Sequence, residues 1–287
     1  MAESPAHKFG QAIGNLLEEI LQPILAEFCS KYNLYLDIKG KRSAREGKKV
    51  IWVDKYGNSH DLDFVIEQGG TADKKGRPVA FIEAAWRRYT KHSRNKAQEI
   101  QGAILPIAER HNWDTPFLGA VIAGIFTGGS ISQLESVGFH VLYIPYDSIV
   151  AAFVSQEVDV QFGEDTEDKV FKKCYKQIEK LPQYKRERIK EHLISANKNS
   201  IDKFKNELRL ALEKLIEEII IIPLYGKDKV FHDISSAISF VNSYQASGND
   251  GTFRKYEVIV KYSNGDSINA SFSDREKLIS FLEYLKR

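Results

Sequence analysis

An acidic residue stands at an unusual place in each of two apolar stretches of the sequence. Asp63 lies in the stretch 60–67, which reads His-Asp-Leu-Asp-Phe-Val-Ile-Glu. Glu83 follows four apolar residues and precedes three in the stretch Val79–Trp86. A carboxylate in such surroundings costs free energy unless it meets water, a cation or another partner. Because Mg²⁺ prefers oxygen ligands and often takes only one or two of them from a protein, Asp63 and Glu83 predict a magnesium site.

Asp61 is a third acidic candidate, two positions before Asp63. Side chains of a strand alternate between its faces, so one continuous strand over Asp61–Glu67 would place both aspartates on the same face. Asp61 is the weaker candidate ligand, because its position also suits the solvent-exposed start of a strand.

A basic segment directly follows the stretch that contains Glu83. Five of the ten residues from Arg87 to Lys96 are Lys or Arg, and none is acidic. Cationic side chains bind phosphates, and a carboxylate-bound cation activates water, so the two features together suit hydrolysis of a nucleic-acid phosphodiester. Taken alone, such a segment is usually an exposed loop. The predicted DNA-binding residues are Arg87, Arg88, Lys91, His92, Arg94 and Lys96.

These features resemble the motif of the PD-(D/E)XK nuclease superfamily, in which an Asp on one strand precedes a Glu on the next and helices flank both. Within the superfamily, residues 8–146 are most similar to type II restriction endonucleases. The resemblance implies Mg²⁺ bound by Asp63 and Glu83, sequence-specific cleavage of double-stranded DNA, and a homodimer. It also matches Glu18, or its neighbour Glu19, to a helix carboxylate that some members add to the metal site.

The sequence departs from that motif at Ala85. The resemblance implies a lysine there, which orients or helps to deprotonate the attacking water. Three explanations stay open: a substitution introduced to trap an inactive protein, a cation placed elsewhere, at Arg87 or Lys91, or a natural nuclease fold that has lost activity and is kept for binding. Beside a restriction-type endonuclease, the alternatives are a repair or recombination nuclease that recognises DNA structure, and a catalytically silent DNA-binding subunit.

The elements that must position these residues follow from the hydrophobic pattern. Helical spacing predicts a long helix over Gly10–Tyr32 and another over Arg94–Arg110, with Gly10 and Gly14 as close-packing positions in the first. Alternating or continuous apolar runs predict strands over Leu34–Ile38, Lys49–Val53, Asp61–Glu67, Val79–Trp86, Phe117–Phe126 and His140–Ile144. This order predicts an α/β fold with a mixed central sheet flanked by helices.

A shift in composition after residue 162 predicts a division into three parts. The first is a nuclease-like catalytic domain over 1–162, the second a helical basic segment over 163–222, and the third a small α+β module over 223–287 that serves recognition or dimerisation. In the third part, Asn-Gly at 264–265 lies between two strand-like runs and predicts a β-hairpin. No internal repeat is evident.

Composition and charge limit the class of protein. The chain has 287 residues, 41 Lys plus Arg against 39 Asp plus Glu, and 43% hydrophobic residues. These values exclude a disordered chain and a uniformly basic or acidic tail. The two cysteines, Cys29 and Cys174, are too far apart in sequence for a disulfide framework or a zinc motif. The absence of a signal-peptide pattern and of a long apolar stretch predicts a cytoplasmic protein with no membrane segment.

Overall fold

The computed structural model describes residues 4–89, 93–111, 115–163, 165–224, 226–245, 253–263 and 265–285. The chain forms two compact units, Met1–Leu208 and Arg209–Arg287. This division differs from the three parts predicted from composition. The helical segment 163–222 is no separate unit, because most of its helical residues belong to the first unit and its terminal strand belongs to the second.

The first unit is built on a five-stranded sheet in the order β1-β4-β5-β6-β7. Its strands are β1 (Leu34–Ile38), β4 (Phe64–Gln68), β5 (Arg77–Arg87), β6 (Phe117–Gly124) and β7 (Phe139–Pro145). The pairs β1·β4 and β4·β5 are antiparallel, whereas β5·β6 and β6·β7 are parallel. The predicted α/β fold with a mixed central sheet is therefore confirmed.

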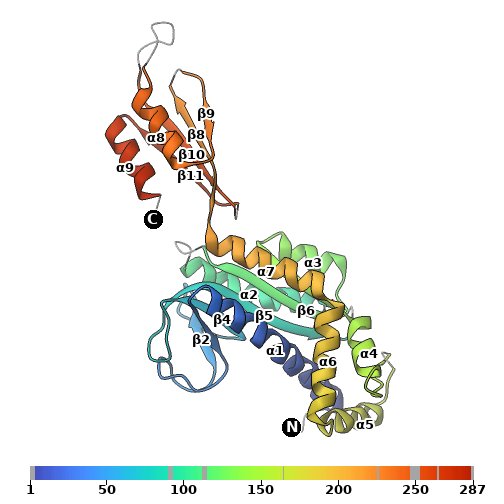
Figure 1. Ribbon diagram of the computed structural model, residues 1–287. Coiled ribbons are helices and arrows are strands. Elements are labelled where there is room, and N and C mark those ends of the chain that lie inside the picture. The colour runs from blue at the N-terminus through green and yellow to red at the C-terminus, as the bar shows by residue number, and fades with distance from the viewer. Residues whose placement is uncertain are drawn as a thin grey trace. The chain divides into compact units, whose positions relative to one another are not determined.

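Helices cover both faces of this sheet, as Figure 1 shows. One face packs against α1 (Pro5–Lys31), α4 (Tyr146–Val154), α5 (Asp168–Glu179) and α6 (Gln183–Ala196). The other packs against α2 (Ser93–Arg110), α3 (Gly128–Glu135) and the hairpin of β2 (Val50–Val53) and β3 (Ser59–Leu62). The helix α7 (Lys198–Glu213) follows α6 and brings the Phe204 ring to 5.4 Å from that of Phe117 in β6. No helix in the described part of the chain is both long and apolar enough to cross a membrane.

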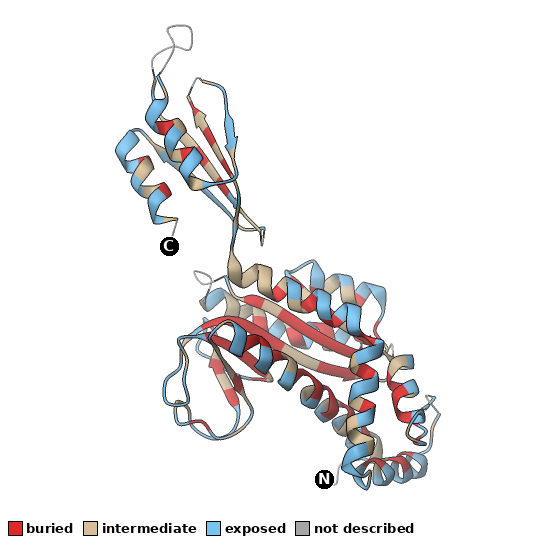
Figure 2. Cartoon of the chain, viewed as in Figure 1, coloured by how far each residue is buried: buried red, intermediate tan, exposed pale blue. Residues whose placement is uncertain are grey.

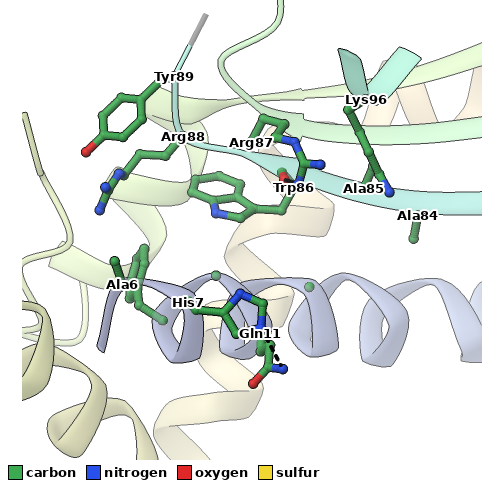
Figure 3. A pocket seen from close by; sticks show the side chains of 13 residues that line it. Ala6, His7, Gln11, Ala84, Ala85, Trp86, Arg87, Arg88, Tyr89 and Lys96 are labelled. Carbon is green, nitrogen blue, oxygen red and sulfur yellow. Dashed lines mark hydrogen bonds between the residues drawn. The ribbon is translucent and has the colours of Figure 1, made fainter. Parts of the chain in front are cut away.

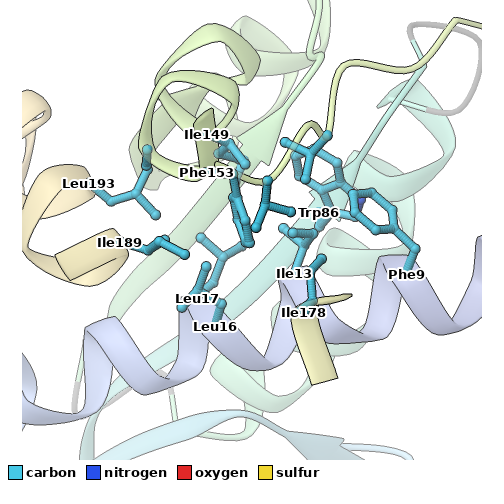
Figure 4. Packing of buried hydrophobic residues seen from close by; sticks show 14 of the residues in the cluster. Phe9, Ile13, Leu16, Leu17, Trp86, Ile149, Phe153, Ile178, Ile189 and Leu193 are labelled. Carbon is cyan, nitrogen blue, oxygen red and sulfur yellow. The ribbon is translucent and has the colours of Figure 1, made fainter. Parts of the chain in front are cut away.

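The helix α1 forms because its apolar residues recur at a spacing of three and four. Phe9, Ile13, Leu16 and Leu17 are buried on one face of the helix, against Trp86 of the sheet and Phe153 of α4 (Figure 4). The helix begins earlier than the pattern predicts, because the Ser4 hydroxyl accepts a hydrogen bond from the His7 N–H at 3.2 Å and caps it. Figure 2 shows the buried residues on the strands and on the inward faces of the helices.

The predicted continuous strand over Asp61–Glu67 is interrupted at Asp63. The residues before Asp63 belong to β3, which pairs with β2, and those after it belong to β4, which pairs with β1 and β5. Asp61 and Asp63 therefore do not share one face of one strand, and that prediction is wrong. The last β4·β5 pair is Phe64 opposite Ile82, so in the described chain β5 continues past Ile82 with β6 as its only strand partner.

The second unit consists of two copies of a strand–strand–helix motif. The first copy is β8 (Ile216–Pro223), β9 (Lys229–Phe231) and α8 (Ile234–Ser243), and the second is β10 (Tyr256–Tyr262), β11 (Ser267–Phe272) and α9 (Arg275–Tyr284). The sheet order is β11-β10-β8-β9, and the antiparallel inner strands place Ile220 opposite Ile259. In each copy the first strand is central and the second strand lies at an edge of the sheet, as a two-fold arrangement of the two halves requires.

Residues at equivalent places in the two copies have the same roles. Asp233 caps α8 and Asp274 caps α9, each through a side-chain oxygen that accepts a backbone N–H three residues on. The tripeptide Ile-Ser-Phe at 238–240 recurs at 279–281. The fully buried helix residues also correspond, with Ala237 and Val241 in the first copy and Leu278 and Leu282 in the second. The expectation that the chain has no internal repeat is therefore wrong.

The two caps give a stability prediction. Replacing Asp233 or Asp274 with Ala removes the oxygen that satisfies an N-terminal N–H, so each variant is expected to lose about 1 kcal/mol of unfolding free energy. Urea denaturation followed by circular dichroism measures the loss. The control is Asp228→Ala at an exposed loop position, expected to stay within about 0.5 kcal/mol of the parent. An equal loss in all three variants would contradict the assigned caps.

Candidate metal centre and adjoining pocket

The structure brings Asp63 and Glu83 together although they are twenty positions apart in sequence. Asp63 lies at the break before β4, and Glu83 is the first residue of β5 beyond the last β4·β5 pair. The Ala84 N–H donates a hydrogen bond of 2.8 Å to Asp63 Oδ2. The two carboxyl groups also share a hydrogen bond between their side chains. The end of one strand and the continuation of its neighbour thus form a carboxyl pair.

Burial and proximity change the protonation of this pair. Burial, and after it the negative charge of Asp63, raises the pKa of Glu83 well above its ordinary value. Burial also raises the pKa of Asp63, while the Ala84 N–H opposes the rise. Two close carboxyl groups away from water retain a proton that a divalent cation would displace, because a cation favours the charged form of both.

Two glutamates with inaccessible oxygens, the buried Glu67 and the half-buried Glu83, differ in their hydrogen-bond partners. Glu67 of β4 accepts two hydrogen bonds from Arg42, at 2.6 and 2.9 Å, and another from the Gly76 N–H. Glu83 Oε1 is just as inaccessible but has no hydrogen-bond partner among the described residues. A buried polar atom without a partner is uncommon and points to an absent ligand or ion.

The other two predicted ligands lie differently. Asp61 of β3 is exposed, and its Oδ2 lies 2.9 Å from Lys49 Nζ in a surface ion pair. Glu18 of α1 is half-buried; burial raises its pKa, and the next contribution is the charge of Asp63, so Glu18 lies within electrostatic range of the pair. Across the described residues there is no group of three or more acidic, histidine or cysteine side chains able to hold a metal. Of the four predicted metal ligands, Asp63 and Glu83 therefore lie together, Glu18 lies near them, and Asp61 lies apart.

Lys96 is the cation that acts on the pair. It lies in the first turns of α2, and its positive charge opposes the raised pKa of both Asp63 and Glu83. Figure 3 shows its side chain extending from α2 towards Ala84 and Ala85. Lys96 Nζ is 3.1 Å from Glu99, and the lysine side chain is 24% exposed. The sequence predicted Lys96 as a phosphate contact and gave no prediction that it lies beside the carboxyls. The available signal was its place at the end of the basic segment and near the start of the helix predicted over Arg94–Arg110.

Ala85 lies where the motif lysine is expected, and its side chain is buried among apolar residues of the face covered by α2. Of the two cations that could replace that lysine, Arg87 donates to the Trp86 carbonyl and lies 3.3 Å from Glu99. Lys91, together with His92, falls outside the residues that the structure describes. Lys96 therefore fits the role of a relocated cation better than Arg87 does.

The other predicted DNA contacts are spread around this end of β5. Arg94 is exposed and is the second residue of α2. Arg88 follows the last residue of β5, and its guanidinium carbon lies 4.1 Å from the Tyr89 ring centre and 4.0 Å from that of Phe171. Its Nε is buried without a hydrogen-bond partner in the described chain. Arg87 and Lys96 share Glu99, whereas no acidic side chain among the described residues pairs with Arg88.

A cavity of about 370 Å³ is lined by Lys96 and by the residues of β5 that follow Glu83, although neither Asp63 nor Glu83 lines it. It lies between α1 and the free side of β5, and it reaches from Lys96 and Ala84 at one end to Arg88 at the other (Figure 3). On α1 it is lined by two glycines, Gly10 and Gly14. The interpretation of these glycines as close-packing positions is wrong, because a Cβ at Gly10 would come no nearer than 3.8 Å to Trp86 and a Cβ at Gly14 would meet nothing within 4 Å.

The residues present fit a divalent cation. Two half-buried carboxyl side chains meet, one of their oxygens is inaccessible and has no hydrogen-bond partner among the described residues, and hard oxygen ligands are what Mg²⁺ binds. Two protein carboxylates are enough, since Mg²⁺ keeps several waters and shares phosphate oxygens. Asp63 and Glu83 are therefore the residues that would hold it.

The raised pKa of Glu83 predicts how stability depends on pH without metal. The unfolded chain releases the Glu83 proton near pH 4.5, whereas the folded chain retains it to higher pH. Folding therefore becomes less favourable as pH rises from the pKa of the unfolded chain to that of the folded chain. Glu83→Gln removes that penalty. In EDTA at pH 7.5 the variant is expected to be more stable than the parent by about 1–3 kcal/mol.

Thermal denaturation at pH 4.5 and 7.5 tests this expectation. The gain should largely disappear at pH 4.5, where the folded parent retains the proton and the unfolded parent is only about half-ionised, and Mg²⁺ should stabilise the parent but not the variant. The facing groups Asp63 and Lys96 are unchanged in both proteins. The same difference in melting temperature at both pH values would show that Glu83 is not titrating differently in the folded state.

The fold and the site define an α/β protein with a half-buried carboxyl pair, a neighbouring lysine and a cation-lined cavity. No protein-family model matches the chain, and no curated protein is significantly similar to it in sequence. The crystal structure of a protein of unknown function, AF1548, is similar at 11% identity over 65% of this chain and 99% of that chain, with a TM-score of 0.29. So loose a superposition has no bearing on fold or function.

Proposed function

We propose that this protein is a Mg²⁺-dependent endonuclease that cuts double-stranded DNA at a short specific sequence, as type II restriction enzymes do. The observation that supports this most is the half-buried pair of Asp63 and Glu83, with a Glu83 oxygen that is inaccessible and has no partner among the described residues, and with the charge of Lys96 acting on both. A carboxyl pair that only stabilised the fold would have its oxygens satisfied, as Glu67 has.

Each residue has a distinct task in this proposal. Asp63 and Glu83 hold the cation, which, when bound, lowers the pKa of a water and neutralises charge on the phosphate. The Ala84 N–H fixes the orientation of Asp63. Lys96 offsets the negative charge that develops at the scissile phosphate and positions the attacking water, the work that the motif assigns to position 85. Arg87, Arg88 and Arg94 bind neighbouring phosphates of the same strand.

The charge around the site supports a polyanionic substrate. None of the described residues that line the cavity is acidic, and three of them are Arg87, Arg88 and Lys96. Phosphate contacts of this kind bind any DNA sequence, so base contacts from other segments must supply specificity. We further propose a cytoplasmic homodimer, because two-fold related active sites match the two strands of a palindrome.

The test is cleavage of unmethylated plasmid and phage DNA with Mg²⁺, followed on gels, beside DNA binding in Ca²⁺ at several salt concentrations. Discrete fragments and a steep fall of affinity with salt are expected. Cutting only at junctions or flaps would indicate a structure-specific repair nuclease instead. Binding without cutting would indicate a catalytically silent subunit, and failure to bind any duplex would contradict the nuclease proposal in every form.

A further inference from the structure

The cavity beside the carboxyl pair is larger and more elaborate than a metal centre requires. It shares Ala84, Ala85 and Lys96 with the surroundings of that pair and continues along β5 to Arg88. We propose that this cavity receives one unpaired nucleotide of the DNA strand that is cut, with its phosphate at Arg88. The inference rests on the proposed function and specifies the form of its substrate.

The phosphate end of the cavity is defined by Arg88. The guanidinium lies against the rings of Tyr89 and Phe171 and makes no hydrogen bond or ion pair with any described residue. Aromatic rings hold the flat face of a guanidinium and leave its N–H edge available, which suits bidentate binding of a phosphate. A partly desolvated cation without an acidic partner is costly unless an anion arrives.

The rest of the lining suits the sugar and base. Trp86 of β5 lines the cavity, and an aromatic surface can stack on a base. His7 and Gln11 of α1 line it with polar groups, and their side-chain nitrogens lie 3.2 Å apart. The volume of about 370 Å³ lies in the range of pockets that hold small organic ligands. A base that remains stacked in a duplex cannot enter such a cavity, so the nucleotide must be flipped out or unpaired.

Two glycines of α1 leave the cavity open and make the helix less stable. A glycine inside a helix is about 1 kcal/mol less favourable than alanine. Gly10 and Gly14 are one turn apart in α1 and both line the cavity. No neighbour requires a glycine at either position, since a Cβ there would make ordinary contact or none. The sequence therefore sacrifices helix stability where a side chain would occupy the cavity.

The experiment measures binding of deoxynucleoside monophosphates by calorimetry in EDTA, where no DNA is cut. The variants are Gly14→Leu, which fills the cavity, and Arg88→Met, which removes the cation and retains length. The matched control is Gly102→Leu, a glycine inside α2 that does not line the cavity and whose Cβ would also meet nothing within 4 Å. The parent and the control are expected to bind equally, and both cavity variants at least about tenfold more weakly.

Further arms keep the inference falsifiable. Gly14→Ala, expected to melt higher than the parent because alanine favours the helix, replaces Gly14→Leu if the latter does not fold. Nucleosides without phosphate should bind no more tightly to the parent than to Arg88→Met. Unchanged nucleotide affinity in folded Gly14→Leu or in Arg88→Met, or no nucleotide binding by the parent at millimolar concentration, would overturn the inference. If the parent cuts DNA and Gly14→Leu cuts it equally well, the nuclease proposal stands and only the nucleotide cavity fails.

Discussion

Under the proposed function, Glu83→Gln is expected to lower the rate of Mg²⁺-dependent DNA cleavage by a factor on the order of 10³ to 10⁴, with the fold intact. The amide retains the shape of the side chain but cannot supply an anionic ligand, and a bound cation contributes several kcal/mol at the transition state. Asp63→Asn is expected to have a similar effect, because the two carboxyl groups form one site. Single-turnover cleavage with saturating enzyme measures the chemical step in each variant.

Two acidic controls test how far the metal site extends. Asp61→Asn changes an exposed carboxylate whose partner is Lys49, so its rate should remain within about twofold of the parent. Glu18→Gln tests the neighbouring carboxylate of α1 and should cause a smaller loss than Glu83→Gln. Loss of cleavage in Asp61→Asn as large as in Glu83→Gln would show that the metal site extends beyond Asp63 and Glu83. Full activity of Glu83→Gln would show that these carboxyls do not hold the catalytic cation.

Lys96→Ala is expected to lower the cleavage rate by a factor on the order of 10² to 10⁴, the range for loss of an acid–base or charge-stabilising group. Lys96 is the described cation whose charge acts on both Asp63 and Glu83, and its side chain extends towards Ala85 (Figure 3). Lys96→Arg should retain more activity than Lys96→Ala. Glu99→Gln, which removes the partner of Lys96 without changing the lysine, serves as the control and should cleave at close to the parent rate.

A swap of positions gives the sharpest test of the relocated cation. Ala85→Lys in the Lys96→Ala background should recover cleavage, because it returns an ammonium group to the position that the motif assigns. Ala85→Lys alone should give no gain, since Lys96 already supplies the charge. A large gain from Ala85→Lys in the parent would instead indicate a site that lacks its cation, as expected of a trapped inactive protein. Unchanged cleavage by Lys96→Ala would remove the lysine from the mechanism.

The main helices and strands were predictable from the residues themselves. The helix of α1, the strands β1 and β5, and the α/β class follow from hydrophobic spacing, because burial of a face imposes its period on the sequence. The two acids in apolar stretches of the sequence were visible for the same reason, since a carboxylate stands out where the pattern requires an apolar side chain. Their separation of twenty positions left the contact between them to strand pairing.

The break at Asp63 was not predictable from alternation. The residues on both sides of Asp63 have strand character, and only their pairing shows that β3 belongs to a hairpin and β4 to the central sheet. The duplication in the second unit was hidden for a related reason. Packing requires apolar residues of suitable size at the shared positions, so Ala237 corresponds to Leu278 and few identities remain between the copies.

By itself the sequence determined the class of fold, the carboxylates at Asp63 and Glu83, the basic segment after them, and the alanine at position 85, where the resemblance implies a lysine. These are properties of residue type and spacing, which the chain carries in any conformation. Only the tertiary structure decided that Lys96 acts on the carboxyls, that Asp61 lies apart in a surface ion pair, and that Gly10 and Gly14 border a cavity. The physical reason is that charge interactions and cavities depend on distances between elements, and these distances are set when α1 and α2 pack against opposite faces of β5.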